Sequence, residues 1–276
     1  IQVKGLIIQN YIDHPSHFES QKTLGDWLKE EEIPALQGID TRMLTRNLRE
    51  HGVMLGKIVT RENTSGIYDP NQENILPYVS TKKVEVYGEG KKNIVLIDCG
   101  AKENIIRSLV KRGVKVTRVP WDFNPITSLP AVGFDGVLIS NGPGDPKRAK
   151  QTIETVKQIL KRNIPVFGIC LGSQILSLAA GGETFKLKFG HRSQNQPVMD
   201  QFSKKAIITS QNHGFAVNMK SLSSDWDEWF VNLNDGTNEG IRHKKKPFMA
   251  VQFHPEASPG PSDGGYLFNE FLEYVS

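Results

Sequence analysis

The sequence predicts an α/β protein of two domains, a smaller mixed α/β domain over residues 1–88 and a mostly parallel-sheet domain over residues 89–276. From Asn93 onward, short apolar runs alternate with segments of helical spacing, which is typical of a parallel sheet with right-handed crossovers. Beyond Gly182 the strand candidates are shorter and more widely separated, which favours an antiparallel extension. The Gly- and Lys-rich stretch 87–92 has the composition of a linker and sets the boundary.

The first domain is predicted to hold two short helices, each with its own capping residue. Thr23 can cap a helix that carries Leu24, Trp27 and Leu28, because a hydroxyl at this position accepts from a first-turn amide. Asp40 can cap a second helix over 41–50, and Gly52 follows its end. The strands expected in this domain cover 5–9 and 55–59.

The second domain has enough strand and helix candidates for a large sheet covered by helices. The expected strands cover 93–98, 114–119, 135–140, 165–169, 206–209, 229–233 and 248–253, and the expected helices cover 101–112, 149–162, 171–180 and 263–275. In parallel sheets of this kind, ligands bind at the carboxyl ends of the strands. Two segments follow such ends and merit attention, the turn at Cys170 and the Gly-rich run 140–146.

Composition excludes several classes of protein. The chain has 276 residues and only two cysteines, which argues against a disulfide framework and for a reducing, cytoplasmic compartment. No apolar run approaches the length of a membrane span. The net charge is +4, and the basic runs lie in predicted turns without interleaved aromatic residues. We therefore expect neither a membrane nor a nucleic-acid partner.

The turn at Cys170 has the pattern of a nucleophile elbow. Gly168 and Gly172 flank the sulfur, an apolar strand precedes it, and a helix follows. The amides at the start of that helix favour the thiolate form of the cysteine. On this pattern alone, a buried structural cysteine remains an alternative, since free cysteine is often buried.

A general base for this sulfur is predicted near the carboxyl end of the chain. His254 follows an apolar strand, and Glu256 is close enough to orient the imidazole ring. An oxyanion hole needs preorganised N–H donors, for which Leu171 and Gly142 are the candidates. Taken singly, His254 could be an ordinary surface histidine and the Gly142 segment an ordinary tight turn.

Local spacing gives no indication of a metal site or a phosphate loop. The sequence has no Cys-x-x-Cys pair and no His-x-x-x-His pair, and Gly142-Pro-Gly-Asp145 lacks the Gly-Lys-Ser/Thr ending of a Walker loop. We therefore expect no metal and no cofactor in this chain.

The motifs together resemble a known family. Gly168-Ile-Cys170-Leu-Gly172-x-Gln174, with the distant His254-Pro-Glu256, resembles the class I glutamine amidotransferases. Further segments resemble the small, glutaminase subunit of carbamoyl-phosphate synthase, or the equivalent region of a fused synthase. These segments are 38–42, 140–146, 211–215 and 258–263.

The resemblance implies an activity and a set of roles. Cys170 would attack the side-chain amide of glutamine, with His254 and Glu256 completing the triad and the amides of Gly142 and Leu171 stabilising the oxyanion. The residues that would bind glutamine are Gly144, Gln174, Asn212, Gly214 and Phe215. The ammonia released would pass to a carbamoyl-phosphate synthetase large subunit or to fused synthetase domains, where ATP and metal are expected.

Two departures from the family pattern stand out, and two alternatives stay open. Ser173 occupies a position where many relatives carry histidine. Relatives also have a longer amino-terminal stretch with a serine that touches glutamine, so the first domain is expected to be incomplete at its start. The alternatives are another cysteine hydrolase on the same scaffold, such as a γ-glutamyl hydrolase or a peptidase, and a non-catalytic regulatory or structural subunit.

Overall fold

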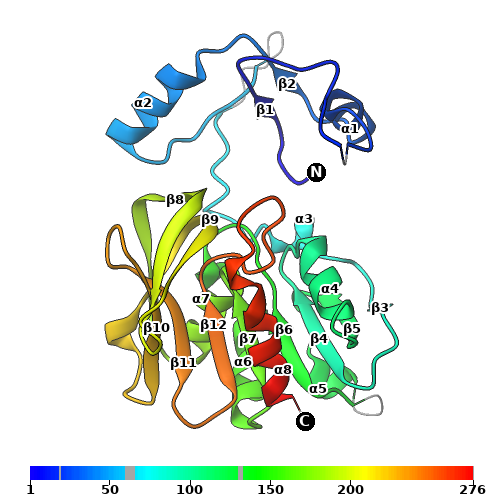
Figure 1. The fold of residues 1–276 in the computed structure, drawn as a ribbon, viewed down its shortest axis with the longest axis vertical. Coiled ribbons are helices and arrows are strands. Elements are labelled where there is room, and N and C mark those ends of the chain that lie inside the picture. Colours follow the sequence, from blue (N-terminus) through cyan, green and yellow to red (C-terminus); the bar gives the residue numbers. More distant parts are fainter. Residues whose placement is uncertain (19, 60–65, 130–132, 276) are drawn as a thin grey trace. The chain divides into compact units, whose positions relative to one another are not determined.

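The computed structural model describes residues 1–18, 20–59, 66–129 and 133–275, and the chain forms two compact units (Figure 1). The units are Ile1–Asp69 and Pro70–Ser276. Their division lies earlier than the predicted boundary at residues 88 and 89. Residues 70–88 therefore contribute α3 (Leu76–Val79) and β3 (Glu85–Tyr87) to the second unit. In these described ranges, no helix has both the length and the apolarity needed to span a membrane.

The first unit contains the two predicted helices, with the predicted caps. Its elements are β1 (Leu6–Ile7), α1 (Leu24–Glu30), β2 (Ala35–Leu36) and α2 (Thr41–His51), and β1 pairs in parallel with β2. The hydroxyl of Thr23 accepts from Asp26 N at 3.0 Å, and Asp40 Oδ1 accepts from Met43 N at 2.9 Å. The strand expected over residues 55–59 is wrong, because the described residues there have no regular structure.

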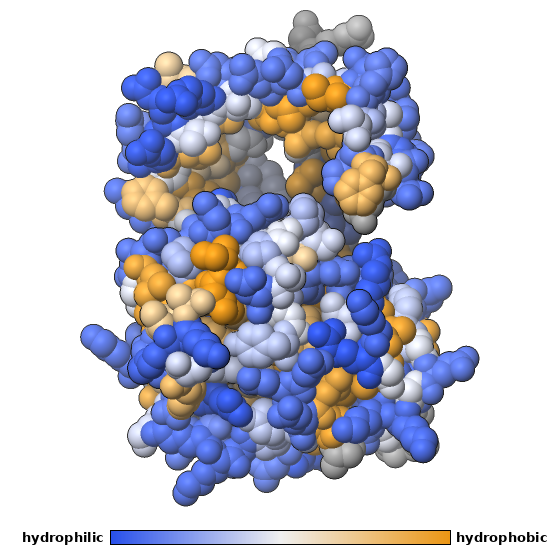
Figure 2. Space-filling model, viewed as in Figure 1, coloured by the Kyte–Doolittle hydropathy of each residue, from blue (hydrophilic) through white to orange (hydrophobic). Residues whose placement is uncertain are grey.

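Most hydrophobic side chains of the first unit stay exposed, as Figure 2 shows on the face in view. Leu28 is the only hydrophobic side chain buried among the unit's described residues. Met43 of α2 and Met54 are about half exposed, at 50% and 53%. A unit with so little buried apolar surface gains little of the hydrophobic stabilisation, about 1.5–3 kcal/mol per large side chain, that folding normally provides.

The second unit is built on a ten-stranded sheet in the order β3-β5-β4-β6-β7-β12-β11-β10-β8-β9. The parallel strands are β4 (Asn93–Asp98), β5 (Lys115–Pro120), β6 (Gly136–Ile139), β7 (Val166–Ile169) and β12 (Phe248–Val251). The antiparallel extension comprises β8 (Glu183–Asp200), β9 (Ala206–Asn218), β10 (Trp226–Asn232) and β11 (Asn238–His243). Both the predicted parallel sheet and its predicted extension are confirmed.

Helices cover both faces of the parallel strands (Figure 1). The helices α4 (Glu103–Val110) and α8 (Leu267–Tyr274) pack on one face, and α5 (Pro125–Ser128), α6 (Lys150–Lys161) and α7 (Leu171–Ala179) pack on the other. Short 3₁₀ turns cover Pro146–Arg148, Met219–Ser221 and Asp263–Tyr266. Because both faces are covered, β4 and β7 are buried along their whole length, which explains their unbroken apolar runs.

Aromatic packing fixes α8 on the sheet. The ring of Phe167 in β7 lies 5.9 Å from that of Phe268 and 5.6 Å from that of Phe271, measured between centroids. Since β7 ends at Ile169, this contact also fixes the strand that leads directly into Cys170. The turns that follow β4, β6, β7 and β12 begin at the carboxyl ends of neighbouring parallel strands, so they gather at one end of the sheet.

Candidate active site

Cys170 lies in a strained turn between β7 and α7. Its backbone angles are φ 54° and ψ −104°, a backbone conformation that residues other than glycine rarely adopt. Its N–H donates to Val251 O of β12 at 2.8 Å. A Cβ added at Gly168 would lie 2.5 Å from Gly172 O, and one added at Gly172 would lie 2.1 Å from Ile139 O. Both glycines are therefore required by close backbone approaches around the sulfur.

His254 and Glu256 lie in the turn after β12 and form a buried pair. His254 Nδ1 donates to Glu256 Oε1 at 2.7 Å, and the ring lies close enough to Cys170 for the sulfur to act on the pKa of the imidazole. Burial lowers the pKa of His254, but the negative charges of Cys170 and Glu256 outweigh this and raise it to about 9. Burial raises the pKa of Glu256, and the facing imidazolium together with Lys102 brings it below its ordinary value.

Two residues from the start of α4 hold Glu256 in place. Lys102 Nζ lies 3.4 Å from Glu256 Oε1, and the amide of Asn104 donates to the main-chain carbonyl of Glu256. Neither residue could be predicted from the sequence. They lie about 150 positions from Glu256 in the chain, and no local pattern marks either of them as its partner.

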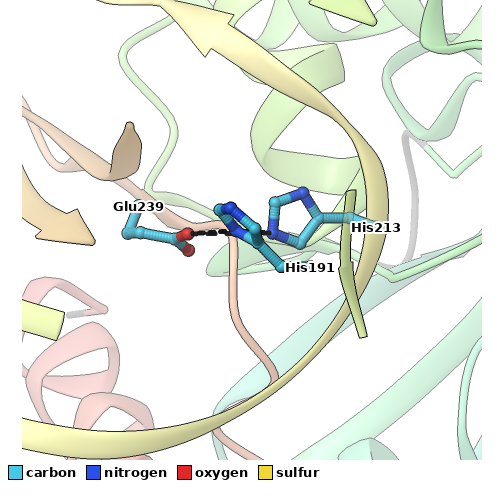
Figure 3. Close-up of side chains that lie close together, drawn as sticks. All are labelled: His191, His213 and Glu239. Carbon is cyan, nitrogen blue, oxygen red and sulfur yellow. Dashed lines mark hydrogen bonds and ion pairs between the residues drawn. The ribbon is translucent and has the colours of Figure 1, made fainter. Parts of the chain in front are cut away.

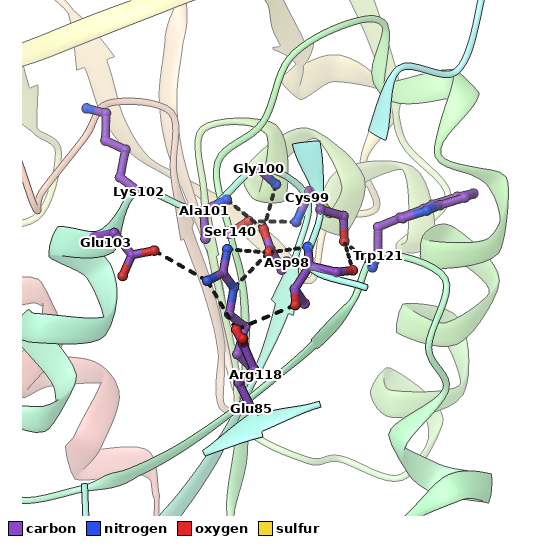
Figure 4. A network of polar contacts seen from close by, with 12 residues as sticks. Glu85, Asp98, Cys99, Gly100, Ala101, Lys102, Glu103, Arg118, Trp121 and Ser140 are labelled. Atoms are coloured by element: carbon purple, nitrogen blue, oxygen red, sulfur yellow. Dashed lines mark hydrogen bonds and ion pairs between the residues drawn. The ribbon is translucent and has the colours of Figure 1, made fainter. Parts of the chain in front are cut away.

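A buried carboxylate shapes the loop that leads to these residues (Figure 4). Asp98, at the end of β4, accepts from Gly100 N at 2.8 Å and Ala101 N at 2.7 Å, and it pairs with Arg118 at 2.7 Å. Arg118 in turn lies 3.4 Å from Glu85 and 3.3 Å from Glu103. A charge-assisted network of this kind fixes the loop after β4.

The loop after β4 is also fastened to the Gly-rich run after β6. Cys99 N donates to Ser140 Oγ at 2.8 Å, and Lys102 N donates to Asn141 Oδ1 at 3.0 Å. A Cβ at Gly142 would lie 2.1 Å from Cys99 O and 2.7 Å from a side-chain methyl of Leu171. Gly142 and Leu171, the two predicted oxyanion donors, are thus brought side by side. As the first residue of α7, Leu171 has no acceptor for its N–H within the helix.

Of the predicted glutamine-binding residues, Gln174 and Phe215 are directly joined. Gln174 Nε2 donates to Phe215 O at 2.9 Å and to Gln252 Oε1 at 3.0 Å. Asn212 is exposed on β9, where it pairs with Arg192 of β8. Gly214 lies on the same strand, and Gly144, with φ +90°, lies against Ile75. Their contacts with glutamine stay predictions.

Ser173, at the position where many relatives carry histidine, lies next to the elbow. Ser173 is fully buried in α7, and its hydroxyl makes no hydrogen bond within the described ranges. Its N–H donates to Cys170 O at 3.0 Å, so it adjoins the elbow without belonging to the triad. The second cysteine, Cys99, is also buried, and burial raises the pKa of its thiol well above the ordinary range, so this thiol stays protonated.

A second group of ionisable side chains, which the sequence analysis did not foresee, could hold a metal ion. His191 of β8, His213 of β9 and Glu239 of β11 converge on one point (Figure 3). None of the three residues was assigned a role from the sequence, although His213 lies in the 211–215 segment that carries part of the family resemblance. No short sequence motif marks this cluster, because its three residues come from separate strands.

The comparisons with known proteins agree with this fold. Residues 95–274 match the family model "Glutamine amidotransferase class-I", and residues 1–58 match "Carbamoyl-phosphate synthase small chain, CPSase domain". A crystal structure of a glutamine amidotransferase from Thermotoga maritima has a TM-score of 0.51 and 18% identity, covering 67% of this chain and 85% of that one. That likeness concerns the fold alone.

Relatives align over nearly the whole chain. The mouse protein "Carbamoyl-phosphate synthase [ammonia], mitochondrial" is 47% identical over 278 residues, which cover 100% of this chain. The chain spans 18% of the length of that relative. The "Carbamoyl phosphate synthase small chain" of Methanopyrus kandleri is 45% identical over 285 residues, covering 99% of this chain and 78% of that protein.

A doubly covered parallel sheet with a strained cysteine elbow defines the class, and the chain belongs to the class-I glutamine amidotransferase family. Within that class, its amino-terminal match and its relatives place it with the small chain of carbamoyl-phosphate synthase. The family resemblance found in the sequence is confirmed.

Proposed function

We propose that this chain hydrolyses glutamine to glutamate and ammonia through Cys170, His254 and Glu256, and supplies the ammonia to a synthetase partner that forms carbamoyl phosphate. The observation that carries the proposal is the position of the His254 ring. Its Nδ1 bonds Glu256 Oε1 at 2.7 Å, and the ring lies near enough to Cys170 for the sulfur to raise the pKa of the imidazole. An imidazole so placed can take a proton from the thiol and give one to a leaving amine.

The reaction would proceed in two halves. In the first, the Cys170 thiolate attacks the side-chain carbonyl carbon of glutamine, and the resulting oxyanion is stabilised by the amides of Leu171 and Gly142. The His254 imidazolium then donates its proton to the amide nitrogen, the C–N bond breaks, and ammonia leaves. In the second half, His254 takes a proton from water, the hydroxide cleaves the γ-glutamyl thioester, and the thiolate is restored as glutamate leaves.

The role of the partner follows from the chemistry of ammonia. Free ammonia protonates in bulk water and loses its nucleophilicity, so it would have to pass directly to the group that consumes it. The large chain or the fused domains of a carbamoyl-phosphate synthase would bind ATP and its metal and would use this ammonia. Names of relatives that include "small chain" support such a division of labour.

The competing function is a non-catalytic subunit. The mouse relative's name specifies ammonia, so a chain of this family with a silent glutaminase is the alternative to test. The complete triad geometry favours catalysis. The Gln211–Phe215 segment and the carbamoyl-phosphate-synthase domain over residues 1–58 argue against an unrelated cysteine hydrolase.

The deciding experiment replaces Cys170 with serine in the full synthase that contains this chain. We expect Cys170→Ser to abolish carbamoyl phosphate synthesis from glutamine while synthesis from added ammonium continues, because only the first step needs the sulfur. A glutamine-dependent rate that survives the change would refute the role of Cys170. An unchanged protein that uses ammonium but never glutamine would instead establish the non-catalytic alternative.

A further inference from the structure

Three side chains from three strands of the antiparallel extension meet with their acceptor atoms facing one another. His191 Nδ1 lies 3.0 Å from Glu239 Oε1 and 3.2 Å from His213 Nε2, and His213 Nε2 lies 3.7 Å from Glu239 Oε1 (Figure 3). Glu239 is fully buried, and only about a tenth of the His191 side chain is exposed, at 11%. The cluster plays no part in the triad described above.

The outer nitrogen of each ring already has a partner, and this fixes which nitrogen carries the proton. His213 Nδ1 lies 2.9 Å from Phe215 O, and a carbonyl can only accept, so Nδ1 is the donor. His191 Nε2 lies 2.8 Å from Asp235 Oδ2, where it likewise donates. In neutral rings the lone pairs are then on His191 Nδ1 and His213 Nε2, the two atoms that face Glu239. These two nitrogens and Glu239 Oε1 are three atoms with free electron pairs that face one another.

We infer that His191, His213 and Glu239 form a binding site for one divalent transition-metal ion of the zinc type. Tetrahedral Zn²⁺ with bonds of 2.0–2.1 Å places its ligand atoms about 3.3 Å apart. The three observed separations of 3.0, 3.2 and 3.7 Å bracket that value. Two imidazoles and one carboxylate are also a ligand set that zinc and ferrous iron accept in proteins.

The surroundings of the cluster have the features of an outer ligand shell. Metal-bound histidines usually donate their other nitrogen to a carboxylate or a main-chain carbonyl, as His191 does to Asp235 and His213 does to Phe215. Ligating carboxylates are themselves hydrogen-bonded, and Asn232 Nδ2 donates to Glu239 Oε1 at 3.1 Å. The second oxygen, Glu239 Oε2, is buried and makes no hydrogen bond within the described part of the chain.

A fourth ligand is within reach of the same point. Gln211 Oε1 lies 3.2 Å from His213 Nε2, so either this amide oxygen or a water molecule can complete a tetrahedron. The cluster is closest to solvent on the side of His191 and Asp235, whose side chains are 11% and 43% exposed. The expectation of a metal-free chain relied on short His and Cys spacings, whereas these ligands come from β8, β9 and β11.

A proton is the competing occupant of the cluster. A charged His191 could donate to Glu239 and Asp235 at once, and these two carboxylates raise the pKa of His191 to about 9 against the effect of burial. The two occupants are distinguishable, because a metal ion requires both imidazoles and Glu239 together. A shared proton leaves no saturable metal site.

The test is metal binding by the full chain carrying Cys170→Ser, which removes the thiol that would also attract zinc. After treatment with a chelator, we titrate with Zn²⁺ by calorimetry and with Co²⁺ by visible absorption, which reports nitrogen and oxygen ligation directly. We expect one ion per chain. Glu239→Gln and His191→Asn should each abolish binding, and Asp235→Asn should weaken it by about 10- to 100-fold.

The matched control is His14→Asn, which removes an exposed imidazole from the first unit and should leave binding unchanged. Circular dichroism of each variant shows whether it is folded, and if Glu239→Gln fails to fold, His191→Asn decides the question. The proposal is overturned if Zn²⁺ does not saturate any site below about 1 mM, a very weak affinity. It is also overturned if binding survives in the folded Glu239 and His191 variants.

Discussion

Two clusters of imidazole and carboxylate groups lie in the same unit, and they differ in what the ring nitrogens face. His254 Nδ1 bonds Glu256, and Cys170 also lies close enough to act on the ring, so the imidazole has two different neighbours. His191 and His213 each turn one nitrogen toward the same carboxylate, Glu239. The first arrangement can pass a proton from one group to the next, whereas the second can surround a cation. The same residue types are thus suited to different chemistry according to whether their nitrogens face different groups or the same carboxylate.

The clusters also differ in how the chain assembles them. His254 and Glu256 belong to one turn after β12, and Cys170, the proposed nucleophile, follows the neighbouring strand β7. The second cluster needs three strands of the antiparallel extension in the correct register. The cluster of Cys170, His254 and Glu256 could therefore be predicted from the sequence. The cluster of His191, His213 and Glu239 could be identified only from the structure. Three changes would break or sharpen this contrast.

The largest effect is expected from Glu256→Gln, which removes the negative charge that faces the His254 ring. The amide cannot stabilise the imidazolium, so kcat for glutamine hydrolysis should fall by about 10²- to 10⁴-fold, the range typical of lost acid–base catalysis. Glutamate release measures the rate. The control is Glu228→Gln, a carboxylate of β10 that bonds Asn238 at 3.1 Å and should have little effect. A Glu256→Gln chain with normal kcat would mean that His254 is oriented by other groups.

A smaller effect is expected from Gly172→Ala, which tests the backbone that presents the sulfur. The added Cβ would lie 2.1 Å from Ile139 O, so main chain must move. The free energy of unfolding, measured with urea, should fall by about 1–3 kcal/mol, as for other overpacked sites. At Gly265 no atom lies within 4 Å of such a Cβ, so Gly265→Ala should stay within about 0.5 kcal/mol of the unchanged chain. Equal stability of the two variants would contradict a closely packed elbow.

The smallest effect is expected from a change of pH. The pKa of folded His254 is about 9 against an ordinary 6.5, so its interactions stabilise the fold fully below about pH 6.5. This contribution is lost as the pH rises through about 9. The difference in unfolding free energy between the unchanged chain and His254→Asn should therefore shrink from about pH 6 to pH 10.

The same titration identifies the cause of the raised pKa. Cys170 is the main group that raises it, so a Cys170→Ser chain should show a lower His254 midpoint when the ring protons are followed by NMR. An identical midpoint in both chains would mean that the sulfur does not face the ring. That result would contradict the proposed arrangement of Cys170, His254 and Glu256.

Much of the fold could be predicted because local physical chemistry determines it. The caps at Thr23 and Asp40 were predictable because their side chains bond amides three residues ahead. The strands β4 and β7 were predictable because burial on both faces requires unbroken apolar runs. β8 was not foreseen, because most of its eighteen residues are partly or fully exposed and its sequence lacks a regular apolar alternation.

In the candidate site too, residues in short motifs could be predicted, whereas residues joined only by the tertiary structure could not. An elbow motif and a His-x-Glu motif are short patterns, so Cys170, His254 and Glu256 could be nominated from sequence. Lys102 and Asn104 could not, because their contact with Glu256 depends on how the loop after β4 meets the turn after β12. The network around Asp98 was likewise hidden, since it joins groups from three strands.

The main-chain oxygen of Phe215 receives two side-chain donors, Gln174 Nε2 and His213 Nδ1, each at 2.9 Å. A carbonyl oxygen has two lone pairs, so its accepting capacity is already used within the protein. A ligand entering beside Phe215 can obtain a hydrogen bond from that oxygen only by displacing one of these side chains. Discrimination between an amide and a carboxylate on the incoming molecule must therefore come from other acceptors.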